Sequence, residues 1–263
     1  MCMPAPFDRV DVWTTRSDEA SDSGGPLAAP AARDRLERYR TLLSPEETAR
    51  CNRLLHEADQ QRFLIARAMV RTMLSQYVDI PPAAWRFRIE TYGRPEVAEL
   101  PYGAPDLRFN LSHTTGLVTC AVTVGRDIGV DVENVHREVT HEVPERFFSA
   151  QEVADLRALP AGDQPLAFFD YWTLKEAYIK ARGLGLALPL GQFTFHRRPG
   201  QAPIISFAPE LHDDASSWQF ALFWPTADHR MAIGVRRSGA DLPIEISSVV
   251  PEVWLGSSGV QAE

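Results

Sequence analysis

Two acidic residues at alternate positions of a strand-like segment give the first chemical signal. The segment "GVDVEN" (residues 129–134) carries Asp131 and Glu133 two positions apart. Because successive side chains of a strand point to opposite faces, both carboxylates lie on one face, about 6.6 Å apart. Two negative charges at that distance repel each other by roughly 0.6–2.5 kcal/mol. The pair therefore predicts a cation nearby, supplied by solvent, by an arginine or by a more specific site.

A second group of charged side chains lies on a predicted helix. The segment "WTLKEAYIKARGLGL" (residues 172–186) is typical of a helix that ends near its first glycine. At 3.6 residues per turn, Trp172, Glu176 and Lys180 follow one stripe of this helix, with Lys175 beside them. Glu176 and Lys180 could be an ordinary surface pair worth about 0.3–0.5 kcal/mol, and Trp172 could be a core residue.

Three further polar residues follow strand and turn signals. The segment "LRFNLSHTTG" (residues 107–116) alternates apolar and polar side chains, with Ser112 on the polar face and His113 at its expected end. "TYGRPE" (residues 91–96) is typical of a turn. His113 could be a structural hydrogen bonder or a catalytic group. Arg94 could be a surface charge or could bind a phosphate in a bidentate manner.

The overall composition limits the class of protein. The chain has 263 residues with 44% hydrophobic content, enough for one large domain or two small ones with a sizeable core. Its net charge of −8 argues against a general nucleic-acid binder. The three cysteines (Cys2, Cys51 and Cys120) have no metal-ligand spacing and favour free thiols in a reducing compartment. The sequence lacks an 18-residue apolar span and the apolar core of a signal peptide, so we expect a cytoplasmic protein without a membrane segment.

The chain carries a similar pattern twice. Two S-x-x-E capping boxes, at Ser44 and Ser149, predict helix starts about 105 residues apart. A longer helical pattern follows each box, at residues 58–77 and 167–183, and strand-like runs follow each helix. Chance similarity is the alternative explanation, and we favour a repeat. A cleft between two such halves is a natural place for a ligand.

This pattern predicts an α+β fold with two similar halves. The predicted division is residues 1–40 as a partly flexible N-terminal segment, 41–125 as the first half, 126–237 as the second half and 238–263 as a C-terminal tail. Residues 17–32 are rich in Ser, Gly, Pro and Ala and are expected to be flexible. In the tail we expect a docking strand followed by a loose end.

Several segments, taken together and in order, resemble a known family. They are "YGRP", "FNLSH", "GVDVE", "RFFSAQE" and "WTLKEAYIKARGLGL". Their order and content resemble the Sfp-type 4′-phosphopantetheinyl transferases, from about Ser44 to the last strands of the second half. The combination of "GVDVE" with W-T-x-K-E-A-Y-x-K is highly specific. The resemblance implies two α+β halves related by pseudo-twofold symmetry, with the active site in the cleft between them.

The resemblance also implies a reaction. Members of this family transfer the 4′-phosphopantetheine arm of coenzyme A to a serine of an apo acyl or peptidyl carrier protein and release 3′,5′-ADP. The resemblance assigns Mg²⁺ binding to Asp131, Glu133 and Glu176, and Mg²⁺ prefers such oxygen ligands. The expected base is Glu176, directly or through a metal-bound water, with Glu133 as the second choice. The metal would then be the cation that the acidic pair requires.

Four more residues are assigned to the phosphates and the pantetheine arm. Lys180 is expected to pair with the pyrophosphate and to stabilise the departing ADP oxygen. His113, next to Ser112, is expected to bind the phosphates. Lys175 is expected to face the pantetheine or the phosphates.

The remaining assignments concern the nucleotide end of coenzyme A. Arg62 and Arg50 are expected to hold the 3′-phosphate, and Arg94 is expected to lie near the adenine. At two positions the residue differs from the one that is common in the family. Arg94 replaces a residue that is commonly lysine, and Glu47 stands where the family often has an additional basic residue.

Two other functions remain as alternatives. The first is another Mg²⁺-dependent transferase that acts on a nucleotide diphosphate, although the chain has no G-x-x-x-x-G-K-[ST] phosphate loop. The second is a module that binds coenzyme A or a carrier protein without chemistry. The presence of Asp131, Glu133, Glu176 and Lys180 together argues against such a module.

The expected macromolecular partner is a carrier protein. Carriers of this kind are usually acidic around their serine, so the docking surface should be basic or apolar. The candidate docking residues are Arg33, Arg35, Arg38, Arg40, Arg86 and Arg88, although solvated surface is the favoured interpretation of these arginines. Because one chain holds both halves, we expect a monomer.

Overall fold

A computed structural model describes residues 8–17, 30–140, 142–198 and 200–251. The helices are α1 (Pro30–Arg40), α2 (Pro45–Asn52), α3 (Glu57–Leu74), α4 (Glu142–Phe147), α5 (Ala150–Ala158) and α6 (Gln164–Arg182). The strands are β1 (Val10–Arg16), β2 (Phe87–Ile89), β3 (Pro95–Val97), β4 (Leu107–Thr114), β5 (Leu117–Val124), β6 (Ile128–Asn134), β7 (Phe193–His196), β8 (Ile204–Phe207), β9 (Trp218–Thr226), β10 (His229–Arg236) and β11 (Ile244–Ser248). Among these described helices, none has both the length and the apolarity needed to cross a bilayer.

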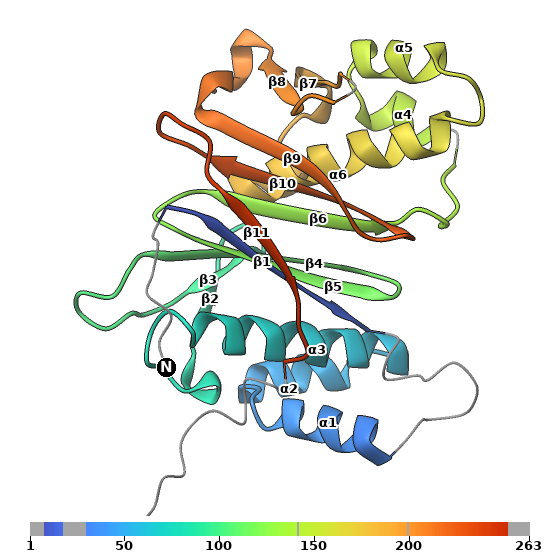
Figure 1. The fold of residues 1–263 in the computed structure, drawn as a ribbon. Coiled ribbons are helices and arrows are strands. Elements are labelled where there is room, and N and C mark those ends of the chain that lie inside the picture. Colours follow the sequence, from blue (N-terminus) through green and yellow to red (C-terminus); the bar gives the residue numbers. More distant parts are fainter. Residues whose placement is uncertain (1–7, 18–29, 141, 199, 252–263) are drawn as a thin grey trace, which may run out of the picture.

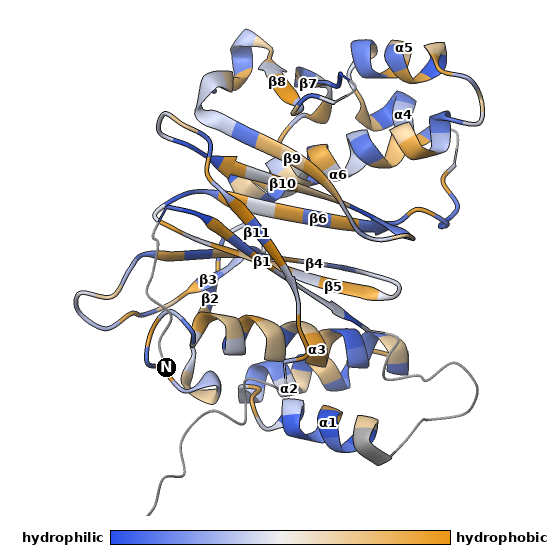
Figure 2. Cartoon of the chain, in the orientation of Figure 1, coloured by the Kyte–Doolittle hydropathy of each residue, from blue (hydrophilic) through white to orange (hydrophobic). Residues whose placement is uncertain are grey.

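Two main sheets meet at the centre of the molecule (Figure 1). The first has the strand order β11-β1-β5-β4 and the second β6-β10-β9, and two short strand pairs, β2-β3 and β7-β8, accompany them. Helices α1–α3 cover the outer side of the first sheet, and α4–α6 cover the outer side of the second. Each helical layer buries its own apolar cluster. Figure 2 shows further hydrophobic residues on the strands where the sheets meet, and these form a third cluster.

The two halves repeat one arrangement of elements. Strand β1 pairs antiparallel with β5, and β6 pairs antiparallel with β10 in the same way. Each half also has a capped short helix, a long helix and a two-stranded pair. The predicted α+β fold with two pseudo-symmetric halves is confirmed.

The N-terminal strand corrects the predicted start of the first half. The sequence placed residues 1–40 outside this half, but β1 lies within its sheet, between β11 and β5, and pairs with β5 as β6 pairs with β10. Val12 opposes Ala121, more than 100 residues away. Such a strand is defined by long-range pairing, which local sequence patterns do not reveal.

The described part of the tail forms the expected docking strand. Strand β11 pairs with β1 in parallel, and Val249 N donates to Thr14 O at 2.8 Å. Val249 also packs against the apolar cluster of the first half. The segment predicted to be flexible, residues 17–32, falls mostly on residues 18–29, and these lie outside the described residues, as do 252–263.

Both predicted capping boxes are confirmed. Ser44 Oγ accepts from Glu47 N at 3.2 Å, and the Glu47 carboxylate accepts from Ser44 N at 3.0 Å. In the second half, Ser149 Oγ accepts from Glu152 N at 3.2 Å, and Glu152 accepts from Ser149 N at 2.8 Å. These bonds satisfy amides at the helix start that have no partner within the helix, so α2 and α5 begin where the sequence indicates.

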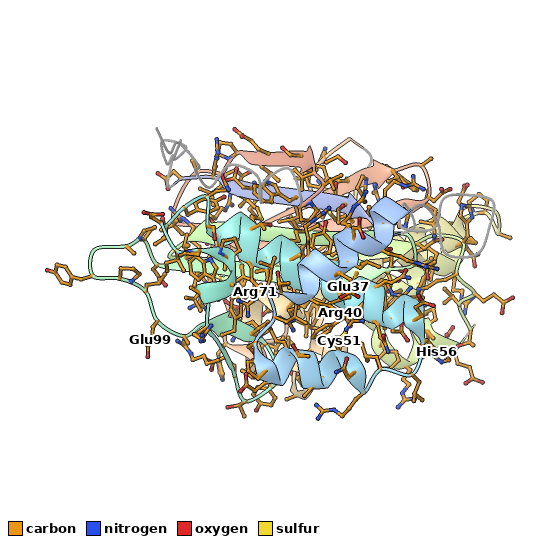
Figure 3. The ribbon with its side chains drawn as sticks, turned by 90° about the horizontal axis from the view of Figure 1, so that it is seen from below. Glu37, Arg40, Cys51, His56, Arg71 and Glu99 are labelled. Carbon is orange, nitrogen blue, oxygen red and sulfur yellow. The ribbon has the colours of Figure 1, made fainter. Side chains whose placement is uncertain are left out.

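A buried arginine explains the unexpected acid at position 47. Arg71 on α3 is 1% exposed and donates to Glu47 Oε2 at 2.6 Å and to two backbone carbonyls near Trp85. Figure 3 shows Arg71 and Cys51 among the helices of the first half. Glu47 therefore neutralises a buried charge. Cys51 and Cys120 are buried free thiols, as the absence of metal-ligand spacing predicted.

Candidate active site between the two halves

The candidate site is built on the junction between strands β4 and β6. Strand β6 is an edge strand of its sheet, so one side of its backbone needs partners from outside that sheet. Its amides donate to Asn110 Oδ1, Ser112 Oγ and Thr114 Oγ1 of β4 at 3.1, 3.2 and 3.3 Å. The polar residues at alternate positions of β4 thus join the two halves. They also fix the position of the acidic strand.

Helix α6 lies unusually close to this strand. A Cβ atom at Gly129 would lie 2.0 Å from the carbonyl oxygen of Ala177, so only glycine allows this approach. Because Glu176 and Lys180 are on the same helix, the close packing brings them to the carboxylates of β6. Gly129 is therefore required by the geometry of the site.

Asp131 and Lys180 form a partly buried ion pair at the centre of the junction. Lys180 Nζ lies 2.7 Å from Asp131 Oδ1, and it also donates to Ser112 Oγ at 2.9 Å and to Val130 O at 3.2 Å. Ser112 in turn donates to Asp131 Oδ1 at 2.9 Å. Asp131 Oδ2 is buried and has no hydrogen-bond partner. One carboxylate oxygen of Asp131 is therefore left for a further ligand.

Glu133 is held by an arginine and a tryptophan. Arg137 donates to both of its carboxylate oxygens at 2.9 and 3.0 Å, and Trp172 Nε1 donates to Oε1 at 3.1 Å. Burial and the neighbouring Asp131 raise the pKa of Glu133, whereas Arg137 opposes this shift. Trp172 therefore orients Glu133 as well as packing in the core.

Glu176 faces a pocket of about 270 Å³ that both halves line. Its wall consists of Tyr92, Gly93, Arg94, Pro95, Asn110 and Leu111 from the first half and Glu176, Ile179, Lys180, Gly183 and Gly185 from the second. Burial raises the pKa of Glu176 to about 7, with Asp131 and Glu133 adding repulsion and Lys180 opposing them. A carboxylate with this pKa is suited to accept a proton near neutral pH.

The donor set at the junction fits a hard divalent cation. In the described part of the chain, no three His, Cys, Asp or Glu side chains already surround one point in the manner of metal ligands. However, Asp131 has an unpartnered buried oxygen, and the pKa values of Glu133 and Glu176 respond to neighbouring carboxylates. Lys180 and Arg137 now neutralise two of these acids. Carboxylate oxygens are the ligands that Mg²⁺ prefers.

Comparison with known proteins identifies the family. A family model described as the 4′-phosphopantetheinyl transferase superfamily matches residues 127–234, and one described as 4′-phosphopantetheinyl transferase, N-terminal, matches residues 30–125. The chain is 32% identical over 227 residues to 4′-phosphopantetheinyl transferase Sfp of Bacillus subtilis (strain 168), covering 86% of this chain and 96% of that protein. The chain belongs to the Sfp-type 4′-phosphopantetheinyl transferase family.

Two other relatives match over large parts of both chains. 4′-Phosphopantetheinyl transferase HetI of Nostoc sp. (strain PCC 7120 / SAG 25.82 / UTEX 2576) is 37% identical over 181 residues, covering 68% of this chain and 71% of its own. 4′-Phosphopantetheinyl transferase psf-1 of Bacillus pumilus is 30% identical over 222 residues, covering 84% and 91%. The matched region spans both halves of this transferase.

The basic residues expected at the phosphates of the transferase lie in two places. His113 is near Lys180 and Arg62: desolvation by the surrounding protein lowers its pKa, and the two cations lower it further. Arg62 itself pairs with Asp59. Arg50 instead stacks on a phenylalanine ring and lines a separate hollow of about 300 Å³ in the first half. Arg62 is therefore close enough to His113 to influence its pKa, whereas Arg50 lines a different pocket.

Ser112 and Arg94 are more strongly engaged by the protein than the sequence suggested. Ser112 is 6% exposed, and its hydroxyl forms hydrogen bonds with Lys180, Asp131 and the amide of Val132. Arg94 donates to a backbone carbonyl of α6 and to a carboxylate on β3, so both Nη atoms have partners within the protein. Ser112 thus orients charged groups, and Arg94 lines the pocket as a contact between the halves.

Lys175 is a correction to the predicted coenzyme A contacts. Its side chain is 0% exposed and lies 2.8 Å from Glu152 Oε2, with further bonds to the carbonyls of Leu190 and Phe193. Burial lowers its pKa, and Glu152 opposes this shift. The residue before Glu176 points to a different side of α6, because adjacent helix positions are about 100° apart. Lys175 therefore holds α5 against α6 and does not face the pocket.

Replacement of Lys175 should reduce stability and leave ligand binding intact. In Lys175→Met, the Glu152 carboxylate remains buried without its counter-charge, at a cost of about 3–5 kcal/mol in unfolding free energy. Chemical denaturation measures this loss. The double variant Lys175→Met/Glu152→Gln should recover part of it, because it removes the unpaired charge. A large rise in KM for coenzyme A without a loss of stability would contradict the structural role.

The sequence did not identify Arg137 as a site residue. Arg137 stacks over the rings of Phe169 and Trp172 at 5.3 and 5.9 Å while it binds Glu133. Its position four residues after Glu133 was the only local signal, and this spacing is common among surface ion pairs. Thr114, which donates to Glu133 at 3.5 Å, was likewise not distinguished from other strand residues.

Proposed function

We propose that this transferase moves the 4′-phosphopantetheine arm of coenzyme A to a serine of an apo acyl or peptidyl carrier protein and releases 3′,5′-ADP, in a Mg²⁺-dependent reaction. One observation supports the proposal most strongly. An unpartnered oxygen belongs to Asp131, whose other oxygen binds the ammonium group of Lys180. Lys180 and Glu176 line a pocket formed by both halves, and the charge of Asp131 raises the pKa of Glu133 and of Glu176. Such a site offers separate places for a cation, a phosphate and a proton.

Asp131, Glu133 and Glu176 would hold Mg²⁺, as the family resemblance suggested. The ion, when bound, would neutralise charge on the pyrophosphate as its anhydride bond breaks. Cation binding would compete with Lys180 for Asp131 and with Arg137 for Glu133, because these side chains now supply the positive charge. Release from Asp131 would free the Lys180 ammonium for a phosphate oxygen.

Proton transfer, charge stabilisation and phosphate binding are assigned to different residues of this chain. Glu176 accepts the proton of the carrier serine, whose oxygen attacks the phosphorus that bears the pantetheine arm. The bond from this phosphorus to the ADP oxygen breaks, and Lys180 stabilises the charge that develops on that oxygen. Arg62 and His113 bind the phosphates on the first-half side of the site. Glu133 is the second candidate for the base.

A direct assay tests the proposed activity. The enzyme is incubated with coenzyme A, Mg²⁺ and each of several purified apo carriers, and intact mass is measured. We expect a mass increase of one phosphopantetheine arm, its loss when chelator replaces Mg²⁺, and its absence when the carrier serine is replaced by alanine. No mass increase with any carrier that a control transferase modifies would contradict the proposal.

Arg62 should discriminate coenzyme A from its 3′-dephospho form. If its guanidinium binds the 3′-phosphate, Arg62→Ala should raise KM for coenzyme A by about 10-fold or more and change KM for 3′-dephospho-coenzyme A little. Arg53, an exposed arginine nine positions before Arg62 in the sequence, provides the control. Arg53→Ala should change neither KM value. Equal losses for both substrates in Arg62→Ala would remove Arg62 from the 3′-phosphate site.

The oligomeric state, location and partners of the enzyme are proposed from its composition and from the lining of the pocket. We propose a monomeric enzyme in the cytoplasm, with no nucleic-acid or membrane partner, because one chain supplies both walls of the pocket and the acidic composition disfavours polyanions. Among the suggested carrier contacts, Arg88 pairs with Glu90 and Glu96 and Arg40 pairs with Glu37, which reduces the charge that they offer a partner.

A further inference from the structure

The turn between β2 and β3 contacts the end of α6 across the pocket. Arg94 in this turn donates from Nη1 to the carbonyl of Ala181 at 2.8 Å and, more weakly, to that of Lys180 at 3.5 Å. Carbonyls in the last turn of a helix lack partners within the helix, and the negative end of the helix dipole favours a cation there. Arg94 therefore caps the helix that carries two of the proposed catalytic residues.

Gly183 provides the space for this contact. It ends α6 in the left-handed region, with φ of +65°, which glycine adopts without strain. A Cβ atom at this position would lie 2.7 Å from Arg94 Cζ and 2.9 Å from its Nε and Nη1 atoms. The guanidinium thus packs directly on the helix end, and a side chain at Gly183 would push it away.

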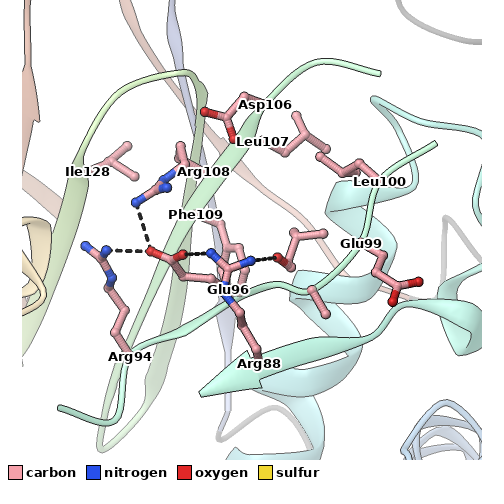
Figure 4. A pocket seen from close by; sticks show the side chains of 12 residues that line it. Arg88, Arg94, Glu96, Glu99, Leu100, Asp106, Leu107, Arg108, Phe109 and Ile128 are labelled. Carbon is pink, nitrogen blue, oxygen red and sulfur yellow. Dashed lines mark hydrogen bonds and ion pairs between the residues drawn. The ribbon is translucent and has the colours of Figure 1, made fainter. Parts of the chain in front are cut away.

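Glu96 holds Arg94 in place. Figure 4 shows the Glu96 carboxylate among three guanidinium groups that come from β2, from the turn and from β4. Glu96 Oε1 lies 2.5 Å from Arg94 Nη2 and 2.8 Å from Arg108 Nη2, and Oε2 lies 2.5 Å from Arg88 Nη2. The Glu96 side chain is 11% exposed and that of Arg94 is 17% exposed, whereas Arg88 is 52% exposed. The bonds to Arg94 and Arg108 are therefore the less screened ones.

We propose that Glu96 is a positioning residue, which holds Arg94 against the last turn of α6 and so fixes Glu176 and Lys180 relative to the first half. Its effect on catalysis rests on the proposed function, whereas the contact itself is a property of the fold. A planar guanidinium can donate to the helix carbonyl and to Glu96 in different directions at once, which a single ammonium group does less well. This accounts for arginine, rather than the lysine common in the family, in the turn.

Hydrogen exchange tests the contact without any assay of activity. In Glu96→Gln and in Arg94→Met, the amides of residues 179–183 should exchange about 10-fold faster than in wild type, because loss of the cap lets the last turn open more often. The matched control is Glu99→Gln, which removes a carboxylate from the same hollow. Unchanged exchange in Glu96→Gln, or an equal increase in Glu99→Gln, would overturn the proposal.

Kinetics and a double variant test the path through Arg94. Glu96→Gln should lower kcat by about 10-fold, since small displacements of catalytic groups are costly. Arg94→Met should do the same, and Arg94→Met/Glu96→Gln should be no slower than Arg94→Met alone. Additive losses would mean that Glu96 acts through Arg88 or Arg108 and would overturn the proposal. If the wild type transfers no arm to any carrier, the proposed function fails, and hydrogen exchange still decides the role of Glu96.

Discussion

Lys180→Ala should lower kcat by about 100-fold or more and raise KM for coenzyme A by less than 10-fold. The reason is that the ammonium group is aimed at charge that develops on the departing ADP oxygen, so it is worth more in the transition state than in the ground state. Steady-state kinetics at saturating carrier, with coenzyme A varied, separate the two parameters. Lys180→Arg keeps the charge but changes its geometry, and it should recover part of kcat at most.

The structure adds a stability effect to this variant. Lys180 is the counter-charge of Asp131, whose side chain is 7% exposed, so its loss leaves a largely buried carboxylate unpaired in the absence of metal. Lys180→Ala should therefore melt at a lower temperature than wild type in chelator, and Mg²⁺ with coenzyme A should restore part of the difference. A variant with normal kcat and only reduced stability would show that Lys180 is no more than the structural partner of Asp131.

Glu176→Gln should abolish most activity and yet equal or exceed the stability of wild type in chelator. The folded state raises the pKa of Glu176 from 4.5 to about 7, because burial and two neighbouring carboxylates disfavour its charged form. The wild type therefore loses stability as the pH rises from about 4.5 through 7, by on the order of 1–3 kcal/mol, and glutamine removes this loss. The variant should be more stable than wild type at pH 8 and similar to it at pH 4.5.

Ligands should reverse this order. With Mg²⁺ and coenzyme A, wild type should gain stability by preferential binding to the folded state, while Glu176→Gln should gain much less. Its kcat should fall by about 100-fold or more, because both a proton acceptor and a metal ligand are lost. Thermal melts at two pH values, with chelator or with ligands, give all four comparisons. A variant clearly less stable than wild type in chelator at pH 8 would mean that Glu176 supports the fold through a cationic partner.

Asp131→Asn separates the two acids. Asp131 Oδ1 already binds Lys180 and Ser112, so loss of its charge weakens an existing ion pair even without metal. We therefore expect this variant to be less stable than wild type in chelator, unlike Glu176→Gln. In the sequence analysis both carboxylates were assigned to one metal site, and only their different partners in the structure distinguish them.

The local helices and strands and the chemical types of the site residues could be predicted from the amino-acid sequence. Capping boxes at Ser44 and Ser149 depend on contacts within four residues, and both form as predicted. The alternation that places Asp131 and Glu133 on one face of a strand is equally local, as is the helical spacing of Glu176 and Lys180. Such features follow from backbone geometry, so a single amino-acid sequence is enough to predict them.

Which charged side chains pair with one another depends on the tertiary packing of the two halves. Lys175 and Glu176 are neighbours in sequence, but one is fully buried against Glu152 and the other faces the pocket, and this depends on how α6 packs. The place of β1 and the contact of Arg94 with α6 likewise join residues about 90 or more positions apart. Charge pairing of this kind acts through space, and its strength depends on burial and on the nearest opposite charge. The motifs could therefore name the site residues, but only the packed halves show which of them bind one another and which remain free for a ligand.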